Sequence, residues 1–310
     1  MPRSARQNVN QVIQGSRGFL QVPLTGEQYA LGIHGGDHPT ETVIDFARHP
    51  VLAIHGNRTD QTTALRHLIR SITARRSGPE QAALVIFDIN GRLSDETSTL
   101  HTGDHDHDVD YYETYPADIA ERLQAITTLS AQRAAAQDRS PKDRGHGTAS
   151  DPTIYLVIDD IDALPSSIDI TAAKDRAIPQ FFSLGECLES LRNQMRHNIG
   201  LRIIYTTART NALTALTAFS PKVLRGQTNT ITFGTPTNGP IGRRDYDANL
   251  PPGAGHLEAA DPKDNCYLRL AVLDDRIASR RRAIETTAGS LAGTFAPRCL
   301  NDQRQDWPNS

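Results

Sequence analysis

The residues of this sequence best suited to chemistry lie at the ends of apolar runs. The first run, VLAIH (51–55), is followed by Gly56 and then by leucine and isoleucine at helical spacing, which is the strand–loop–helix context of a phosphate-binding loop. A loop of the form G-x-x-x-x-G-K-[ST] placed on Gly56 would end on Gln61, Thr62 and Thr63. Only the first glycine and the final hydroxyl match this pattern, and the lysine is missing.

The departures from the pattern fall where anion binding needs particular residues. Thr62 cannot supply the lysine cation, Gln61 adds a side chain where glycine allows close backbone approach, and Asp60 adds a negative charge. Arg58 is a cation, but it precedes the lysine position and would point from the turn rather than from the helix start. We therefore expect weak nucleotide binding by the predicted loop, which comprises Gly56, Asn57, Arg58, Thr59, Asp60, Gln61, Thr62 and Thr63.

The second candidate is the acidic pair at the end of IYLVIDD (154–160). An apolar strand followed by Asp159 and Asp160 has the form of a Walker B strand, in which the first acid holds Mg²⁺ through water and the second polarises the attacking water. Strands also often end in an aspartate that caps the following loop, so the pair alone leaves both interpretations open. Thr63 and Asp159 could together hold a metal ion, and we expect any binding of ATP and Mg²⁺ to be weak.

The elements that must position these residues alternate along the chain. Helical patterns cover residues 62–75, about 117–137 and about 179–197. They alternate with four continuous apolar runs, which indicate a sheet covered on both faces: VLAIH (51–55), ALVIFDI (83–89), IYLVIDD (154–160) and LRIIYTT (201–207). The sequence therefore predicts an α/β domain with a mostly parallel central sheet flanked by helices.

Shorter β-like pieces surround this core. Residues 18–46 are split by glycine and proline and predict a small N-terminal β addition, while TNTITF (228–233) and NCYLRLAVL (265–273) predict closing strands. We divide the chain into a flexible arm (1–18), the α/β domain (19–275), and a C-terminal helix with a mobile tail (276–310).

The composition of the chain limits which classes of protein it can belong to. A net charge of −3 and a pI of about 6.4 argue against a stable complex with nucleic acid. The three cysteines are widely spaced, which indicates neither a disulfide framework nor a zinc knuckle and fits a reducing compartment. No window approaches the roughly 18 consecutive apolar residues of a membrane span, so we expect a cytoplasmic protein.

One segment invites a metal-site interpretation. HTGDHDHDVDYYE (101–113) crowds histidine and aspartate together, and His-x-His can place two imidazoles on one side of a strand. No partner follows at a fixed spacing, so we expect a solvated acidic loop and no metal site.

Downstream of the acidic pair, the sequence resembles a known family. GLRIIYTTARTNAL (200–213) resembles the strand and sensor segment of FtsK/SpoIIIE-type motor ATPases. Thr207 and Arg209 match the sensor, and Ala208 stands at a glutamine position. The resemblance implies sensor-like roles for Thr207 and Arg209.

Two further segments are similar to the EccC-type members of that family, which are multi-ATPase subunits of type VII (ESX) secretion machines. LPPGAGHLE (250–258) is similar to their Pro-Pro-Gly-Arg-Gly turn, with Ala254 in place of arginine. Residues 30–56 are similar to the segment that enters their P-loop strand. The resemblance covers roughly residues 20 to 275 and implies a RecA-like P-loop NTPase fold.

EccC-type proteins carry tandem ATPase modules, and the downstream ones are often degenerate and bind secretion substrates. The resemblance therefore implies a degenerate module that acts in substrate binding or ATPase assembly. Its implied partners are small helical WXG-type substrates and a larger EccC-like ATPase or membrane subunit, which would hold it at the inner face of the cell membrane. The alternative is an active motor module that hydrolyses ATP and translocates protein or DNA.

A groove for a helical ligand is predicted beside the helix that starts near Thr62. Its other wall would be TNALTALTAF, in which Leu213, Leu216 and Phe219 recur at helical spacing. The same three residues would also suit an ordinary core.

Overall fold

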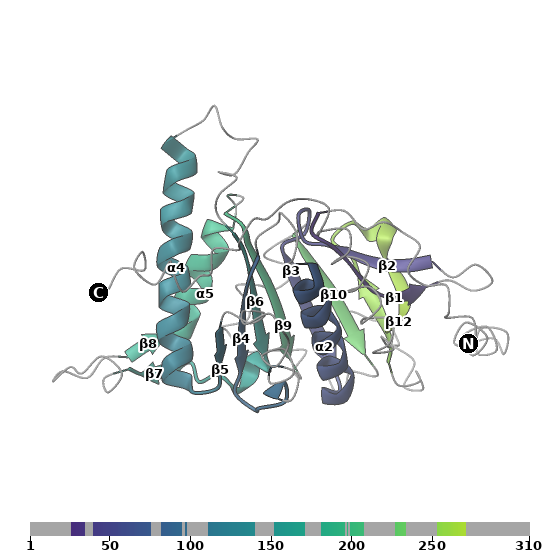
Figure 1. The fold of residues 1–310 in the computed structure, drawn as a ribbon, viewed down its shortest axis with the longest axis horizontal. Helices are drawn as coiled ribbons and strands as arrows, with labels where there is room; N and C mark the ends of the chain where they lie inside the picture. The colour runs from purple at the N-terminus through teal and green to yellow at the C-terminus, as the bar shows by residue number, and fades with distance from the viewer. Residues whose placement is uncertain are drawn as a thin grey trace, which may run out of the picture.

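A large mixed sheet runs through the described part of the chain (Figure 1). A computed structural model describes residues 26–34, 40–75, 82–94, 97, 111–139, 152–170, 181–195, 197, 199–207, 227–233 and 253–270. The sheet has ten strands in the order β2-β1-β12-β11-β10-β3-β9-β6-β4-β5. Its first half is antiparallel and its second half is parallel, which confirms the predicted α/β class with a mostly parallel core.

The parallel half carries the residues singled out above. Its members, in spatial order, are β10 (Thr228–Phe233), β3 (Val51–Gly56), β9 (Leu201–Thr207), β6 (Thr153–Asp159), β4 (Ala82–Asp88) and β5 (Tyr111–Glu113). Along the chain the order of these strands is β3, β4, β5, β6, β9, β10, so β9 is inserted between β3 and β6. Because all of them are parallel, the residues that follow β3, β4 and β6 meet at one carboxyl edge.

The antiparallel half extends the sheet beyond β10. It consists of β11 (Ala254–Glu258), β12 (Cys266–Leu270), β1 (Gln28–His34) and β2 (Thr40–Asp45). β1 and β2 are the predicted N-terminal β addition. The sequence did not predict β11, because this strand lies within LPPGAGHLE, which resembles a turn.

Helices cover the two faces of the sheet, which explains the continuous apolar strands. α2 (Arg58–Arg75) packs on one face with Leu52 and Ile54 of β3, whereas α4 (Pro116–Arg139) and α5 (Leu184–Gln194) pack on the other face with Val51 and Ala53. Alternate residues of one strand therefore enter opposite cores.

Two predicted helix starts are wrong. The sequence predicted that α5 begins near residue 179, but it begins at Leu184. Residues 181–183 instead form β8 (Phe181–Ser183), which pairs with β7 (Ser167–Asp169). Ser183 then caps α5 by accepting a hydrogen bond from the backbone N–H of Glu186 at 3.4 Å. The other error concerns α2, whose start matters for the candidate site.

Candidate functional site

The predicted phosphate loop is helical almost from its beginning. We expected the helix to start at Thr62, but α2 starts at Arg58, directly after Asn57. Asn57 Oδ1 accepts a hydrogen bond from the backbone N–H of Asp60 at 2.9 Å, and Asn57 Nδ2 donates to Asp60 Oδ2 at 2.6 Å. These contacts are those of a helix N-cap, and the signal for it was Asn57 three residues before an acid.

The two threonines at the lysine and hydroxyl positions are bound to their own helix. Thr62 Oγ1 donates to the carbonyl oxygen of Arg58 at 2.8 Å, and Thr63 Oγ1 donates to that of Thr59 at 2.9 Å. Such bonds to the preceding turn are ordinary for threonine within a helix. Neither hydroxyl donates a hydrogen bond to Asp159 or Asp160.

Gln61 and Asp60 connect α2 to other parts of the fold. Gln61 is buried, and its Nε2 donates to the carbonyl oxygens of Thr207 at 2.7 Å and Gly56 at 3.1 Å. Asp60 is buried as well, and its Oδ1 accepts from the backbone N–H of Gly253 at 2.9 Å. Both side chains therefore hold the helix start in place, and Gln61 does so at the position where the phosphate-loop pattern has glycine.

Gly56 is retained for a reason internal to the sheet. Its φ is +123°, and a Cβ at this position would lie 2.1 Å from the carbonyl oxygen of Phe233 on β10. Only glycine tolerates both the backbone angle and the close approach.

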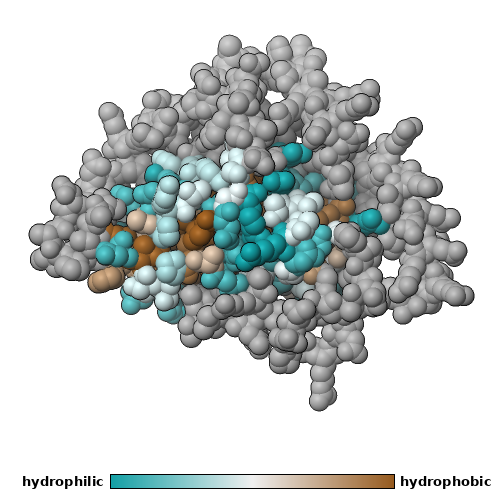
Figure 2. All heavy atoms as spheres, turned by 90° about the horizontal axis from the view of Figure 1, so that it is seen from below, coloured by the Kyte–Doolittle hydropathy of each residue, from teal (hydrophilic) through white to brown (hydrophobic). Residues whose placement is uncertain are grey.

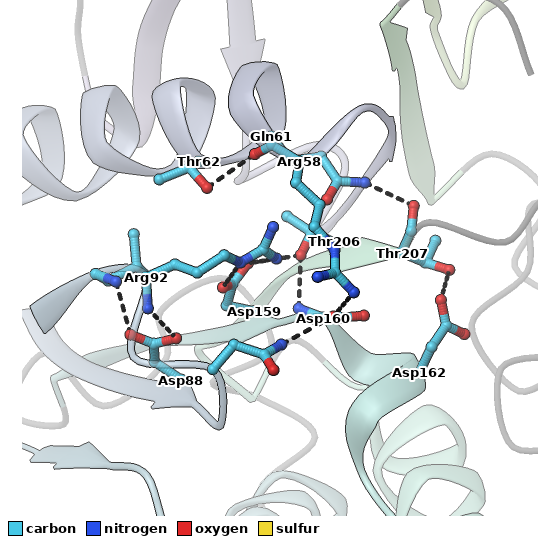
Figure 3. Close-up of polar contacts among 12 residues, drawn as sticks. Arg58, Gln61, Thr62, Asp88, Arg92, Asp159, Asp160, Asp162, Thr206 and Thr207 are labelled. Carbon is cyan, nitrogen blue, oxygen red and sulfur yellow. Dashed lines mark hydrogen bonds and ion pairs between the residues drawn. The ribbon is translucent and has the colours of Figure 1, made fainter.

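Asp159 lies at the end of β6, and both of its carboxylate oxygens accept hydrogen bonds from Arg92 (Figure 3). Arg92 Nε donates to Oδ2 at 2.7 Å and Arg92 Nη2 donates to Oδ1 at 2.6 Å. The Thr206 hydroxyl donates to Oδ1 at 2.8 Å. Burial raises the pKa of Asp159, and Arg92 and Thr206 oppose that shift.

Asp160 is held next to this pair in a left-handed conformation, with φ 55° and ψ 63°. Its backbone N–H donates to Thr206 Oγ1 at 2.7 Å, and its Oδ2 accepts from Asn90 Nδ2 at 2.9 Å. Arg58 Nη2 lies 3.4 Å from the same oxygen, with the Arg58 side chain 67% exposed. Arg58 therefore faces the acidic pair from the first turn of α2.

Asp88 fixes the turn that carries Arg92. It is fully buried at the end of β4 and accepts from the backbone N–H groups of Arg92 at 2.9 Å and Leu93 at 2.7 Å. The Tyr112 hydroxyl also donates to Asp88 at 2.9 Å. Burial and the nearby Asp88 carboxylate raise the pKa of Tyr112, so the phenol stays protonated. Sequence reasoning missed Asp88, Asn90 and Arg92, although the segment DINGR (88–92) overlaps the end of the predicted strand 83–89 and continues at this same edge.

The remaining predicted residues separate into two groups. Thr207 lies at the end of β9 with its hydroxyl donating to Asp162 Oδ2, so it does join the carboxyl edge. Arg209, Leu213, Leu216 and Phe219 lie outside the described residues, as do residues 101–110 of the His/Asp-rich segment.

The donor set does not fit the divalent cation that a P-loop fold implies. A metal ion at Asp159 would meet a guanidinium that already uses both carboxylate oxygens. Elsewhere in the described residues, no group of three or more His, Cys, Asp or Glu side chains is placed to hold a metal ion.

Figure 2 shows the molecule from the side of the carboxyl edge, where hydrophilic residues fill the middle of the face and a hydrophobic area lies beside them.

A cavity of about 570 Å³ lies between α4, α5 and β8. It is lined by Gln124, Thr127, Thr128, Ile170, Phe181, Phe182, Ser183, Glu186 and Cys187. Burial raises the pKa of the Cys187 thiol to about 11.

No helix among the described residues is long and apolar enough to cross a membrane.

Comparisons with known proteins agree with this fold. No family model matches the chain. The chain is 29% identical over 220 residues to the ESX-4 secretion system protein EccC4 of Mycobacterium tuberculosis, which covers 69% of the chain and 16% of that protein. It is 26% identical over 233 residues to the ESX-3 secretion system protein EccC3 of the same species, covering 74% of the chain and 16% of that protein. The chain thus spans about a sixth of the length of these relatives.

Solved structures show the same fold. The cytoplasmic domain of the Thermomonospora curvata type VII secretion ATPase EccC aligns with a TM-score of 0.60 and 20% identity, over 82% of the chain and 28% of that structure. EssC (ATPases 2 and 3) from Geobacillus thermodenitrificans aligns with a TM-score of 0.58 and 17% identity, over 89% of the chain and 53% of that structure. The fold is therefore that of P-loop ATPase domains. Together with the sequence similarity, it supports the assignment of this chain to the FtsK/SpoIIIE-type ATPase family as an EccC-like member.

Proposed function

We propose that this chain is a degenerate EccC-like module of a type VII secretion system, which binds a secretion substrate or a partner ATPase and turns over little or no ATP. The observation that carries the proposal is the early start of α2. The stretch from Arg58 to Thr63, where phosphates would need a loop of inward-pointing amides, is the first part of a helix.

The backbone amides near the helix start support the proposal. The N–H of Asp60 donates to Asn57 Oδ1, and the N–H of Gln61 donates to the carbonyl oxygen of Asn57 at 3.1 Å. These donors are already used within the chain, so they do not form the open cradle that binds phosphates in active P-loops.

The charged side chains at the carboxyl edge also support the proposal. Among the described residues, Arg58 pairs with Asp160 and Arg92 pairs with Asp159. A lysine-free loop whose neighbouring arginines face carboxylates has little positive potential left for a triphosphate. The alternative of an active motor would require these contacts to break.

A relative supports the binding role. One solved structure is that of Thermomonospora curvata EccC (ATPases 2 and 3) in complex with a signal sequence peptide, to which the chain aligns with a TM-score of 0.55 and 19% identity, over 82% of the chain and 42% of that structure. By analogy, our module would bind a small helical WXG-type substrate or a larger EccC-like ATPase, and such partners would hold it at the inner face of the cell membrane. We further propose that Leu213, Leu216 and Phe219 form one wall of the groove for that ligand.

The first test is turnover by the purified full chain. We expect no ATP hydrolysis above background and nucleotide affinity no better than high micromolar, near −5 kcal/mol or weaker. Hydrolysis that disappears in an Asp160→Asn variant would refute the proposal, because it would assign working chemistry to this acidic pair.

The second test is capture of a co-encoded secretion substrate or partner ATPase. A Leu213→Asp/Leu216→Asp variant should lose capture while its circular dichroism spectrum stays that of the wild type. Phe181→Asp is the matched control, because it changes an exposed aromatic residue (67% exposed) on β8, at the cavity between α4 and α5. Unchanged capture in the double variant would show that the groove is wrong, and no capture by the wild type would show that the binding role is wrong.

A further inference from the structure

Arg92 lies where the fold family implies a divalent cation. The Asp159 side chain is 0% exposed and the Arg92 side chain is 14% exposed, so their ion pair is largely shielded from water. A buried carboxylate needs a counter-charge, and a guanidinium that binds both oxygens provides one of matching geometry.

The position of Arg92 is fixed by the fold. Asp88 of β4 is paired in register with Asp159 of β6, so the turn that follows β4 begins beside the acidic pair. Asp88 then accepts from the backbone N–H groups of Arg92 and Leu93, which sets the direction of that turn. The arginine is therefore positioned by a second buried carboxylate.

The guanidinium also lies between the strand end and the helix. Its third nitrogen, Nη1, is buried without a hydrogen-bond partner among the described residues, and Figure 3 shows it directed toward the first turn of α2. Arg92 thus lies between Asp159 and the start of α2 (Figure 3).

We propose that Arg92 is a built-in replacement for the divalent cation of this fold, so that the carboxyl edge stays assembled in the absence of Mg²⁺. The inference rests on the proposed function in one respect, since a module without turnover needs no exchangeable metal ion. It adds that any docking surface at this edge is independent of metal and nucleotide.

The experiment compares thermal unfolding of the full chain in EDTA, in Mg²⁺ and in Mn²⁺, and measures Mn²⁺ binding by electron paramagnetic resonance. The wild type should unfold at the same temperature in all three conditions and show no specific Mn²⁺ site. A metal-dependent rise in the unfolding temperature of the wild type, or a specific Mn²⁺ site that Asp159→Asn removes, would overturn the proposal.

The Arg92→Met variant exposes the role of the guanidinium. In EDTA its unfolding temperature should fall by roughly 10 °C, because a buried carboxylate loses its partner. Mn²⁺ should restore part of that loss and bind the variant. Arg192→Met is the matched control, because Arg192 makes a surface pair with Glu189 at 2.9 Å, and its loss should shift the unfolding temperature little.

The Arg92→Met/Asp159→Asn double variant covers the case in which the single variant does not fold. It removes both charges, so it should regain stability relative to Arg92→Met and be insensitive to Mn²⁺. A folded Arg92→Met variant that is as insensitive to Mn²⁺ as the wild type contradicts the proposal. None of these measurements uses substrate capture or ATP turnover, so failure here leaves the proposed function to be judged by its own tests.

Discussion

Thr206 joins the two acidic residues of the candidate site. It is completely buried, its hydroxyl donates to Asp159 Oδ1 at 2.8 Å, and it accepts from the backbone N–H of Asp160 at 2.7 Å. One hydroxyl therefore holds the Asp159 carboxylate and the left-handed backbone of Asp160 together.

We predict that Thr206→Val lowers the free energy of unfolding by about 2–3 kcal/mol, because it leaves the Asp160 N–H buried without an acceptor. Thr63→Val is the matched control. Thr63 is exposed, and its hydroxyl donates to the Thr59 carbonyl oxygen of its own helix, so its loss should cost less than about 0.5 kcal/mol. Urea unfolding measures both changes, and equal losses would contradict the special role of Thr206.

The sequence predicted part of this site. Asp159 and Asp160 were singled out because they end an apolar run, and Thr207 because its segment resembles the sensor of a known family. Arg92 and Thr206 were missed, because their roles depend on β4 and β9 flanking β6, and a single sequence does not show which strands are neighbours. The pattern of the acidic pair reveals the carboxylates but not the cation that reaches them.

At the scale of elements, the start of α2 shows how a motif template can mislead. The template placed a loop from Gly56 to Thr63, whereas local capping by Asn57 begins the helix at Arg58. The strands were predicted well because their apolar runs are long and buried on both faces. The short strands β5, β7 and β8, with three residues each, carry too few residues for a period to appear.

The N-cap gives a direct test of this local control. Asn57→Ala should lower the free energy of unfolding by about 1 kcal/mol, because the Asp60 N–H loses its acceptor, whereas Asn57→Ser keeps an acceptor and should stay close to the wild type. Chemical denaturation of the three proteins measures the difference. If the alanine and serine variants are equally stable, the cap does not set the helix start.

The junction of β3 with β10 gives a second test at this scale. A Gly56→Ala change would place Cβ 2.1 Å from the carbonyl oxygen of Phe233, so the strand pair must shift. We expect a loss of about 3 kcal/mol or more in unfolding free energy.

Gly91→Ala is the control for backbone angle alone. Gly91 also has a positive φ, at +64°, but no atom lies within 4 Å of the point that a Cβ would occupy, so the loss should be about 1–2 kcal/mol. A tolerated Gly56→Ala would mean that close packing against β10 does not explain this glycine.

At the scale of the whole molecule, the two faces of the sheet differ where its parallel half meets its antiparallel half, at β3, β10 and β11. One face there is apolar, and the other carries polar as well as apolar side chains. His55 of β3 is paired in register with Thr232 of β10, which in turn faces His256 of β11. These polar residues share the face that carries α4 and α5 further along the sheet. The sequence predicted the parallel core, but not that Thr232 and His256 would be buried beyond it, with His55 half-buried beside them.

His55 makes the stability of the molecule depend on pH. Burial lowers its pKa from 6.5 to about 4, against the opposing attraction of the Asp162 and Glu258 carboxylates. Because the unfolded chain binds a proton near pH 6.5 and the folded chain does not, His55 favours the unfolded state increasingly as the pH falls from 6.5, and the effect levels off below about 4.

We therefore predict that the wild type loses stability relative to His55→Gln as the pH falls from 6.5 to about 4, by a total of about 3 kcal/mol. Glutamine does not titrate, so subtracting the two curves removes the contribution of the carboxylates that both proteins share. Urea unfolding at a series of pH values gives the difference directly. A difference that is constant across this range would mean that His55 has the same pKa in the folded and the unfolded protein, so its surroundings in the sheet would not keep water away from the imidazole.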